Sequence, residues 1–230
     1  LTGTEAGEVI YENGLPTFDD KVSVLGNGNY DFTLGFRNAF SYKNLSMSVL
    51  VDMKFGADVY SMSKMQSHVN GTSKETLEGR EGWYASEQAR LSVNVDAKHR
   101  TPTGGYVGKG VKAVTDADGN VSYVPNDVYV DPAKYWQALQ NSSPEPFICD
   151  NSFVKLREVS LSYSCPKKWF VHTPIESVTL SAYGRNLLLI YSKVDNIDPE
   201  SSYNNGNGQG FEYGSLPSRR TFGFGINVKF

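Results

Sequence analysis

The strongest constraint on the fold is a strict alternation of apolar and polar side chains. From Leu45 to Phe55 every odd position is apolar, and Leu50 is the only apolar residue at an even position. Successive side chains of a strand point to opposite faces, so this pattern predicts a long strand with one apolar face. A helix would mix the two sets of residues on each of its sides.

The same alternation recurs in four other segments. Val154 and Leu156 are out of phase with Val159 in one of them, so that strand has an irregular start. Only Lys43-Asn44 separates the first two segments, which predicts a two-residue hairpin turn. Lengths of about 10 to 14 residues exceed the usual strand length of about 5 or 6 and match those of transmembrane β-strands. The expected strands lie near residues 31–42, 45–58, 153–165, 175–190 and 220–230.

The connections between these strands are either short or very long. If the strands are antiparallel neighbours, all short turns lie at one end of the sheet and all long loops lie at the other. This asymmetry is typical of outer-membrane β-barrels, whose long loops are extracellular. Compact domains rarely contain loops longer than about 15 residues. The expected extracellular loops are 1–30, 59–152 and 191–219.

The loop 59–152 carries local signals of its own. Helix starts are expected near 73–78, with a Ser or Thr cap, and near 87–91. A small hairpin is expected over 112–124, around Asp118-Gly119-Asn120. Asp131 followed by Pro132 predicts the start of a helix over 131–139.

Composition argues against a nucleic-acid-binding protein and against a helical membrane protein. The 22 Lys and Arg residues nearly balance the 25 Asp and Glu residues, which argues against a nucleic-acid-binding protein. A mean hydropathy of −0.40 and the lack of a long apolar run argue against a transmembrane helix. Aromatic residues gather at both strand ends, as in the girdles of membrane barrels. They are Tyr42, Tyr163, Trp169 and Phe230 at the short-turn end, and Phe55, Tyr60, Phe153, Tyr191 and Phe222 at the other.

No pattern in the sequence indicates an enzyme, a metal site or a cofactor. His68, His99 and His172 lie in separate loops without cysteines or carboxylates at ligand spacing. Asp116 to Asn120 suits a hairpin turn better than a calcium loop, because the later glycine and glutamate of such a loop are missing. The candidate ligand contacts are loop aromatics and polar groups, with ordinary surface residues as the alternative. They are Trp83, Tyr84, Tyr106, Trp136, Tyr203, Asn205 and, on a polar strand face, Arg185.

Several short motifs occur in the order found in one family of transporters. They are Tyr42 to Ser48, Phe153 to Tyr163 followed by Pro166-Lys167, Asp198-Pro199-Glu200, and Arg220 to Val228. With these motifs the chain resembles the late barrel strands of SusC/RagA-type TonB-dependent outer-membrane transporters. Residues from about 100 to 150 match least.

The resemblance implies an all-β fold, namely an antiparallel transmembrane segment from the C-terminal part of a barrel of about 22 strands. It implies a bacterial outer-membrane protein that imports oligosaccharides or peptides with TonB energy. The implied partners are the rest of the barrel and its plug, a SusD-like surface lipoprotein, the TonB complex acting through an N-terminal part, and outer-membrane lipid. Gly225, Val228 and Phe230 resemble a barrel-assembly signal, although Gly223 departs from it.

Five strands cannot close a barrel, which needs about eight. Open sheet edges in hydrocarbon leave backbone groups without hydrogen-bond partners. Other residues or another chain are therefore expected to complete the barrel. The alternative is a soluble all-β carbohydrate-binding domain in which the apolar faces pack sheet on sheet.

Overall fold

The computed structural model describes residues 4, 7–18, 21–96, 101–201, 206 and 208–230. The chain forms two compact units, which are described separately. Unit 1 consists of residues 1–25 and 62–148, and unit 2 consists of residues 26–61 and 149–230. None of the described helices is both long and apolar enough to cross a membrane.

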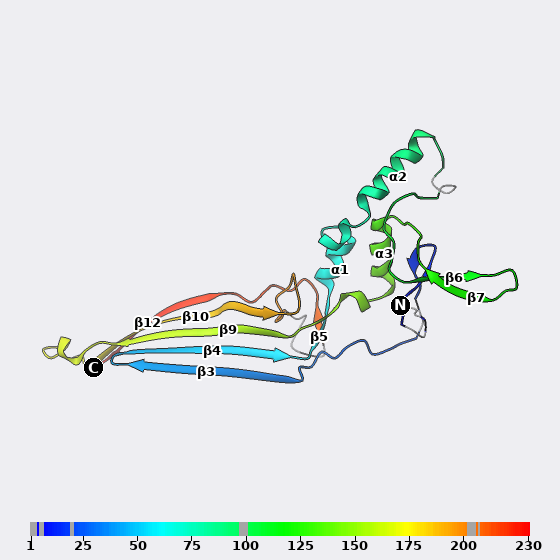
Figure 1. The fold of residues 1–230 in the computed structure, drawn as a ribbon. Helices are drawn as coiled ribbons and strands as arrows, with labels where there is room; N and C mark the ends of the chain where they lie inside the picture. The colour runs from blue at the N-terminus through cyan, green and yellow to red at the C-terminus, as the bar shows by residue number, and fades with distance from the viewer. Residues whose placement is uncertain (1–3, 5–6, 19–20, 97–100, 202–205, 207) are drawn as a thin grey trace. The chain divides into compact units, whose positions relative to one another are not determined.

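Unit 2 is built on a five-stranded antiparallel sheet with the strand order β12-β10-β9-β4-β3 (Figure 1). The strands coincide with the five expected ranges, but β4 ends at Phe55 rather than near residue 58. Gly56 follows with φ +87°, a backbone conformation that L-residues rarely adopt, and this ends the strand. The strands are β3 (Phe32–Tyr42), β4 (Leu45–Phe55), β9 (Phe153–Ser164), β10 (Ser177–Ser192) and β12 (Thr221–Lys229).

The register gives this sheet one apolar face and one polar face, because paired residues share a face. Two adjacent rows across the middle of the sheet show the contrast. One row is apolar and consists of Phe40, Met47, Leu161, Ala182 and Phe224. The next row lies on the other face and consists of Ala39, Ser48, Ser160, Tyr183 and Gly223.

A β-bulge in β9 explains the irregular start that the sequence shows. The register jumps from Glu158 to Leu156 on both sides of β9, so Arg157 has no partner in either neighbouring strand. One extra residue shifts the alternation by one position. Val154 and Leu156 therefore share the apolar face with Val159, despite their opposite phase in the sequence.

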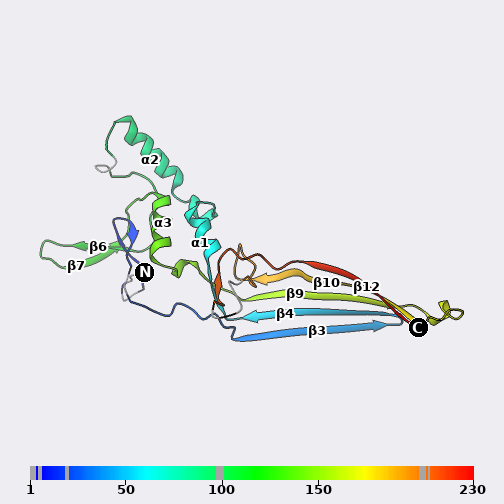
Figure 2. The ribbon, with the colours of Figure 1, turned by 180° about the vertical axis from the view of Figure 1, so that it is seen from behind.

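The short connections lie at one end of the sheet. The turn at Lys43-Asn44, the segment 165–176 with its 3-10 helix η4 (Lys167–Trp169), and the C-terminus gather there in both views (Figures 1 and 2). The connections 56–152 and 193–220 leave from the opposite end. The sorting of short and long connections is thus the one that the sequence predicts.

A small sheet of order β11-β5-β8 lies at the long-loop end of unit 2. Its strands β5 and β11 pair in parallel and lie outside the five long strands, which pair antiparallel as predicted. Phe153 is fully buried and packs edge-on against Tyr30, so it is a core residue and not part of an aromatic girdle. Tyr60 lies in β5 and packs against Phe211, away from the long strands. The strands are β5 (Asp58–Ser61), β8 (Ile148–Asp150) and β11 (Phe211–Glu212).

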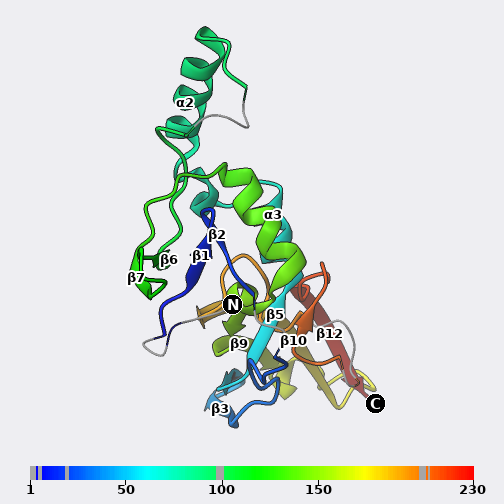
Figure 3. The ribbon, with the colours of Figure 1, turned by 90° about the vertical axis from the view of Figure 1, so that its right-hand side faces the viewer.

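Unit 1 combines helices with a four-stranded sheet of order β2-β1-β6-β7. Figure 3 shows β1 beside the hairpin of β6 and β7, with which it pairs in parallel. The helices are α1 (Met62–Val69), α2 (Arg80–Ser92) and α3 (Pro132–Ser142), with 3-10 turns η1 (Lys74–Leu77) and η3 (Glu145–Phe147). The strands are β1 (Ile10–Glu12), β2 (Leu15–Pro16), β6 (Val111–Thr115) and β7 (Val121–Pro125).

The local predictions for unit 1 are partly confirmed. The hairpin forms where expected, and Asp131 caps α3 by accepting a hydrogen bond from the Ala133 N–H at 2.9 Å. Ser73 precedes η1, but its side chain makes no capping hydrogen bond, so that expected cap is wrong. Helix α1 and the strands β1 and β2 lie in the segments 1–30 and 59–152, for which the sequence predicts loops.

Candidate ligand-binding site

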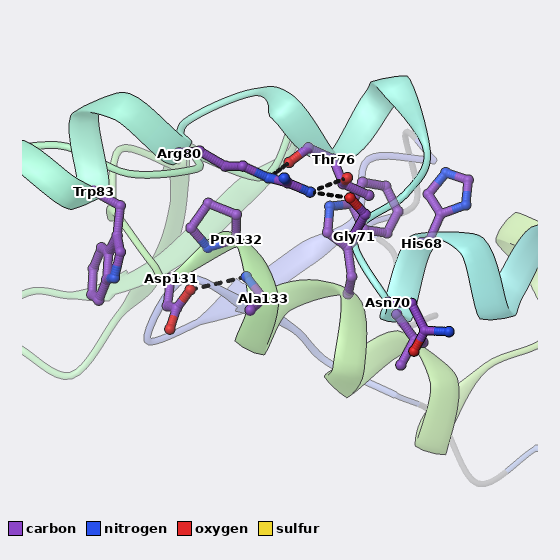
Figure 4. A pocket seen from close by; sticks show the side chains of 11 residues that line it. His68, Asn70, Gly71, Thr76, Arg80, Trp83, Asp131, Pro132 and Ala133 are labelled. Atoms are coloured by element: carbon purple, nitrogen blue, oxygen red, sulfur yellow. Dashed lines mark hydrogen bonds between the residues drawn. The ribbon is translucent and has the colours of Figure 1, made fainter.

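Unit 1 contains a cavity of about 330 Å³ between the end of α1, the start of α2 and the start of α3. Arg80, Trp83, Asp131 and Trp136 are among the residues that line it. Figure 4 shows Arg80 and Trp83 coming from one side of this cavity, and Asp131 and Pro132 from the start of α3. The cavity therefore combines two indole rings with one cation and one carboxylate.

Arg80 is fixed by backbone and side-chain acceptors. Its Nε donates to the Thr76 carbonyl at 2.6 Å, and its Nη2 donates to the Gly71 carbonyl at 2.6 Å and to Thr76 Oγ1 at 2.5 Å (Figure 4). Gly71 has φ +68°, and a Cβ there would lie 2.6 Å from Nη2, so this close approach requires glycine. Within the described residues Nη1 has no hydrogen-bond partner. It is a preorganised donor for a ligand.

Asp131 supplies an acceptor on the other side of the cavity. One of its oxygens, Oδ1, accepts the hydrogen bond that caps α3. The other oxygen, Oδ2, has no partner in the part of the chain that the structure describes. Because capping fixes the carboxylate, Oδ2 is held in place for a hydroxyl or an N–H group.

Glycines bring Trp83 into position. Gly79 begins α2 with φ +79°, and a Cβ there would lie 2.5 Å from the Gly105 backbone. A Cβ on Gly105 would lie 3.0 Å from the Trp83 ring. The start of α2 therefore packs directly on a glycine backbone, which fixes the indole at the edge of the cavity.

Trp136 belongs to an aromatic cluster. Its ring centroid lies 4.5 Å from that of His68, 5.2 Å from that of Tyr135 and 6.1 Å from that of Tyr106. It also lines a second cavity, of about 380 Å³, together with Tyr11, Tyr106 and Tyr135. The Tyr11 and Tyr135 hydroxyls lie 3.3 Å apart, and burial raises the pKa of both Tyr106 and Tyr135. These phenols stay neutral and act as hydrogen-bonding groups.

His68 forms a buried wall of the first cavity. Its Nδ1 lies 2.8 Å from the Lys64 carbonyl, and its Nε2 lies 2.7 Å from Glu75 Oε2. Both ring nitrogens therefore lie within hydrogen-bond distance of an oxygen. The hydrogen bond from His68 lowers the pKa of Glu75, although burial opposes the shift. The pair fixes the ring against Trp136.

This arrangement is suited to binding rather than to catalysis. Flat aromatic faces bind the apolar faces of sugar rings or peptide side chains, and Arg80 and Asp131 provide a donor and an acceptor at the edge. Within the described residues no group of three or more His, Cys, Asp or Glu side chains is placed to hold a metal ion.

The structure brings together three of the predicted contacts. Trp83, Tyr106 and Trp136 line the two cavities. Tyr84 follows Trp83 in α2, but it is exposed and is not among the residues that line either cavity. Arg185 lies in unit 2, where its Nε donates to Glu158 Oε2 at 2.8 Å. Tyr203 and Asn205 lie outside the described residues.

Sequence reasoning missed three residues of the site. Asp131 was recognised only as a helix cap, and His68 was assigned to a solvated loop although it is 2% exposed. Arg80 has no sequence signal, because its fixed position depends on a carbonyl and a glycine from other segments.

The expected assembly signal lies on the last strand. Gly225 is opposite Ser181 in β10, and a Cβ on it would lie 2.7 Å from the Ser181 hydroxyl. Val228 pairs with Val178, and Phe230 follows the end of β12 with an exposed ring. The role of these residues in assembly stays a prediction.

Comparison with known proteins identifies two curated relatives. The chain is 27% identical over 222 residues to TonB-dependent receptor P3 of Formosa agariphila, which covers 94% of the chain and 18% of that receptor. It is 29% identical over 224 residues to TonB-dependent receptor P26 of the same organism, which covers 95% of the chain and 19% of that receptor. The chain thus spans about a fifth of the length of these relatives. No protein-family model matches it.

Solved structures share the fold. The RagAB peptide importer in its closed-closed state matches 100% of the chain over 20% of the importer chain's length. The TM-score is 0.56 and the sequence identity is 15%. A further structure, of the RagAB peptide transporter, matches 97% of the chain and 20% of its own length. Its TM-score is 0.52 and its sequence identity is 17%. These comparisons confirm the resemblance that the motifs predict. Over nearly its whole length, the chain is similar in sequence to two TonB-dependent receptors, and it shares the fold of a part of RagAB.

Proposed function

We propose that the chain forms barrel wall and external ligand-binding segments of an outer-membrane importer that takes up oligosaccharides or peptides with TonB energy. The observation that carries this proposal is the sheet of unit 2, which has one continuous apolar face. The two Formosa relatives are TonB-dependent receptors, and RagAB is a peptide importer. Both findings support transport of a nutrient rather than catalysis.

The apolar face has the chemistry of a lipid contact. Phe224 and Ile226 in β12 are 87% and 73% exposed, and Phe36 and Phe40 in β3 are 54% and 58% exposed. Soluble monomers rarely expose so large a contiguous apolar surface. In a barrel this face contacts lipid, and the opposite Ser-rich face lines an aqueous lumen.

The two outer strands support completion by further strands. Within the described residues, β3 pairs only with β4, and β12 pairs only with β10. A lipid-facing sheet needs partners for the free edges of both strands. The rest of the barrel, with its plug, supplies them in this proposal.

The cavities of unit 1 provide the ligand contacts in this proposal. Arg80 and Asp131 there offer charged hydrogen-bonding groups beside two indoles, which suits either a sugar or a peptide. A SusD-like surface lipoprotein and the TonB complex complete the importer, as the resemblance implies.

The soluble carbohydrate-binding alternative needs a second sheet over the apolar face. The strands of the two smaller sheets are 2 to 5 residues long, against 9 to 16 in the large sheet. Such short strands do not supply a matching sheet. The structure therefore favours the membrane proposal.

A pair of neighbouring substitutions in β4 tests the proposal. Val49→Arg places a cation on the apolar face near the middle of the strand, and Ser48→Arg places the same side chain on the polar face. In lipid the first change costs about 2–4 kcal/mol, whereas a lumen position tolerates charge. We expect Val49→Arg to remove most folded protein from the outer membrane and Ser48→Arg to preserve it.

The measurement is the heat-modifiable band of the full-length protein in isolated outer membranes. Equal loss in both variants, or fractionation of the folded wild-type protein with soluble proteins, contradicts the proposal. The identity of the nutrient is tested separately, by growth on single oligosaccharides or peptides with and without the gene.

A further inference from the structure

The polar face of unit 2 carries a dense cluster of ion pairs at the β9 bulge. Lys155 is 4% exposed. Its Nζ lies 2.6 Å from Glu200 Oε2, 3.3 Å from Asp198 Oδ1 and 2.6 Å from Ser218 Oγ. A buried ammonium needs such a set of partners to offset its lost hydration. Lys155 thus connects a strand of the sheet to both carboxylates of the Asp198-Pro199-Glu200 turn.

Arg157 is the bulged residue, and it binds the same turn. Its two terminal nitrogens donate to the two oxygens of Glu200 at 2.8 and 2.6 Å, in bidentate geometry. They also donate to Asp52 Oδ2 at 2.5 Å and to Asn186 Oδ1 at 2.7 Å. The bulge turns Arg157 to the polar face, next to Glu158 on the same side. Two successive residues of one strand thus face the same way.

The partners of these cations come from both ends of the β10–β12 connection. Ser218 donates to Asp198 Oδ2 from its backbone N–H, at 2.7 Å, and from its hydroxyl. The Pro199 carbonyl accepts a hydrogen bond from Asn151 Nδ2 at 2.8 Å, and the Arg219 carbonyl accepts one from Asn186 Nδ2 at 3.0 Å. Residues 198–200 and 218–219 therefore meet at one point on the sheet.

We propose that Lys155 and Arg157 are positioning residues that anchor the β10–β12 connection to the polar face of the sheet through Asp198 and Glu200. The anchor is electrostatic, because within the described residues the two cations donate only to carboxylate, hydroxyl and amide oxygens. If the polar face lines the lumen of a barrel, the anchored connection borders the path of the ligand. This consequence rests on the proposed function. The anchoring itself does not depend on transport.

Acid is expected to weaken the anchor. Burial acts to raise the pKa of Glu200, but the hydrogen bonds from Arg157 and Lys155 outweigh it and hold the pKa below its usual 4.5. Burial likewise acts on Asp198, but hydrogen bonds from Ser218 and Glu200 and the charge of Lys155 hold its pKa below 3.8. A depressed carboxyl pKa stabilises the fold above the usual value, and this contribution is lost as pH falls through the folded-state pKa.

The other titratable groups at the cluster do not reverse the predicted loss of stability at acid pH. Asp52 is a further carboxylate on Arg157. Burial, with the charges of Glu200 and Asp52, raises the pKa of Tyr30 to about 12, so its phenol is neutral through the acid range. Protonation of the carboxylates is therefore the event that releases the cations.

Hydrogen exchange of the full-length protein tests the anchor. We compare Arg157→Met, Arg157→Lys and Glu200→Gln with the wild type, following peptides from 194–201 and 208–220. Lys193→Gln is the control, because its partner Asp150 forms an exposed pair beside the same connection. We expect exchange about tenfold faster in Arg157→Met and Glu200→Gln, an intermediate rate in Arg157→Lys, and no change in the control.

The Lys variant separates charge from packing, because Met and Lys fill similar volumes. Equal exchange in Arg157→Met and Arg157→Lys, or wild-type exchange in Glu200→Gln, overturns the proposal. If the Met variant fails to fold, wild-type protein is followed from pH 7 to about pH 2 with correction for intrinsic exchange. Selective acceleration of these peptides then supports the anchor, and its absence refutes it. Either result is independent of the Arg substitutions in β4 that test the proposed function.

Discussion

At the scale of single residues, the site depends on Arg80 and Trp83, whose positions are fixed largely by backbone groups. Arg80 is held by the Gly71 and Thr76 carbonyls, and Trp83 packs on the Gly105 backbone. Fixing these side chains before a ligand arrives lowers the entropy lost on binding. This preorganisation is what distinguishes the cavity from the many exposed aromatics of the chain.

Two adjacent aromatics of α2 test the role of the cavity. Trp83 lines it, whereas Tyr84 is 67% exposed and does not. Loss of a stacking aromatic face costs about 1–3 kcal/mol when a ligand ring lies on it, by analogy with base stacking. We expect Trp83→Ala to weaken uptake of the transported nutrient about 5- to 150-fold at limiting concentration. Tyr84→Ala should match the wild type.

The measurement is the concentration of nutrient that supports half-maximal uptake in cells with equal amounts of folded receptor. If both alanine variants take up nutrient like the wild type, the cavity is not a ligand site. If both lose uptake equally, α2 has a structural role that Trp83 does not explain.

At the scale of elements, the long strands were predictable and the bulge was not. Alternation over 11 residues in β4 and 9 residues in β12 gives the two faces of these strands directly. In the sequence, the bulge at Arg157 is visible only as a change in the phase of the apolar alternation in β9. Its position depends on pairing with β4 and β10. β1 and β2 are too short to show a pattern. β1 is held by parallel pairing with β6, about a hundred residues away in sequence, so no local signal predicts it.

The predicted ligand contacts stay a prediction, and they include only part of the residues that line the cavities. Aromatic loop residues are visible in a sequence as ligand contacts, and three of them do line the cavities. The charged partners were missed, because burial of His68 and fixation of Arg80 arise only when α1, η1 and α2 pack together. The same holds for Lys155 and Arg157, whose partners lie about 45 residues further along the chain.

Substitutions of Asn186 in β10 test whether the backbone opposite the bulge is strained. It has φ +52°, and its amide bonds both Arg157 and the Arg219 carbonyl. Asn186→Val and Asn186→Gly both remove these hydrogen bonds, but only the valine carries the backbone strain, of about 1–2 kcal/mol. We expect the valine variant to lose its folded band in detergent at a lower temperature than the glycine variant. Equal midpoints would show that the backbone of the bulge is unstrained.

At the scale of the whole molecule, the central claim is that the sheet of unit 2 separates two environments. Every row of side chains across its five strands belongs to one face or to the other. The apolar rows are exposed in the outer strands β3 and β12 and half-buried in much of β4 and β9, and the polar rows carry the serines, the ion pairs and the anchored connection. A membrane explains both faces together, whereas an aqueous solvent explains only the polar one.

Single cysteines at Ser48, Val49, Leu50 and Val51 test this claim most directly. They are placed one at a time in full-length protein whose native cysteines are replaced, and the protein is studied in outer-membrane vesicles. We expect a charged, water-soluble maleimide to label positions 48 and 50 but not 49 and 51. A fluorophore attached at 49 or 51 after solubilisation should be quenched by brominated lipid on reconstitution. Labelling of all four positions at equal rates, or no lipid quenching at 49 and 51, would contradict a lipid-facing sheet.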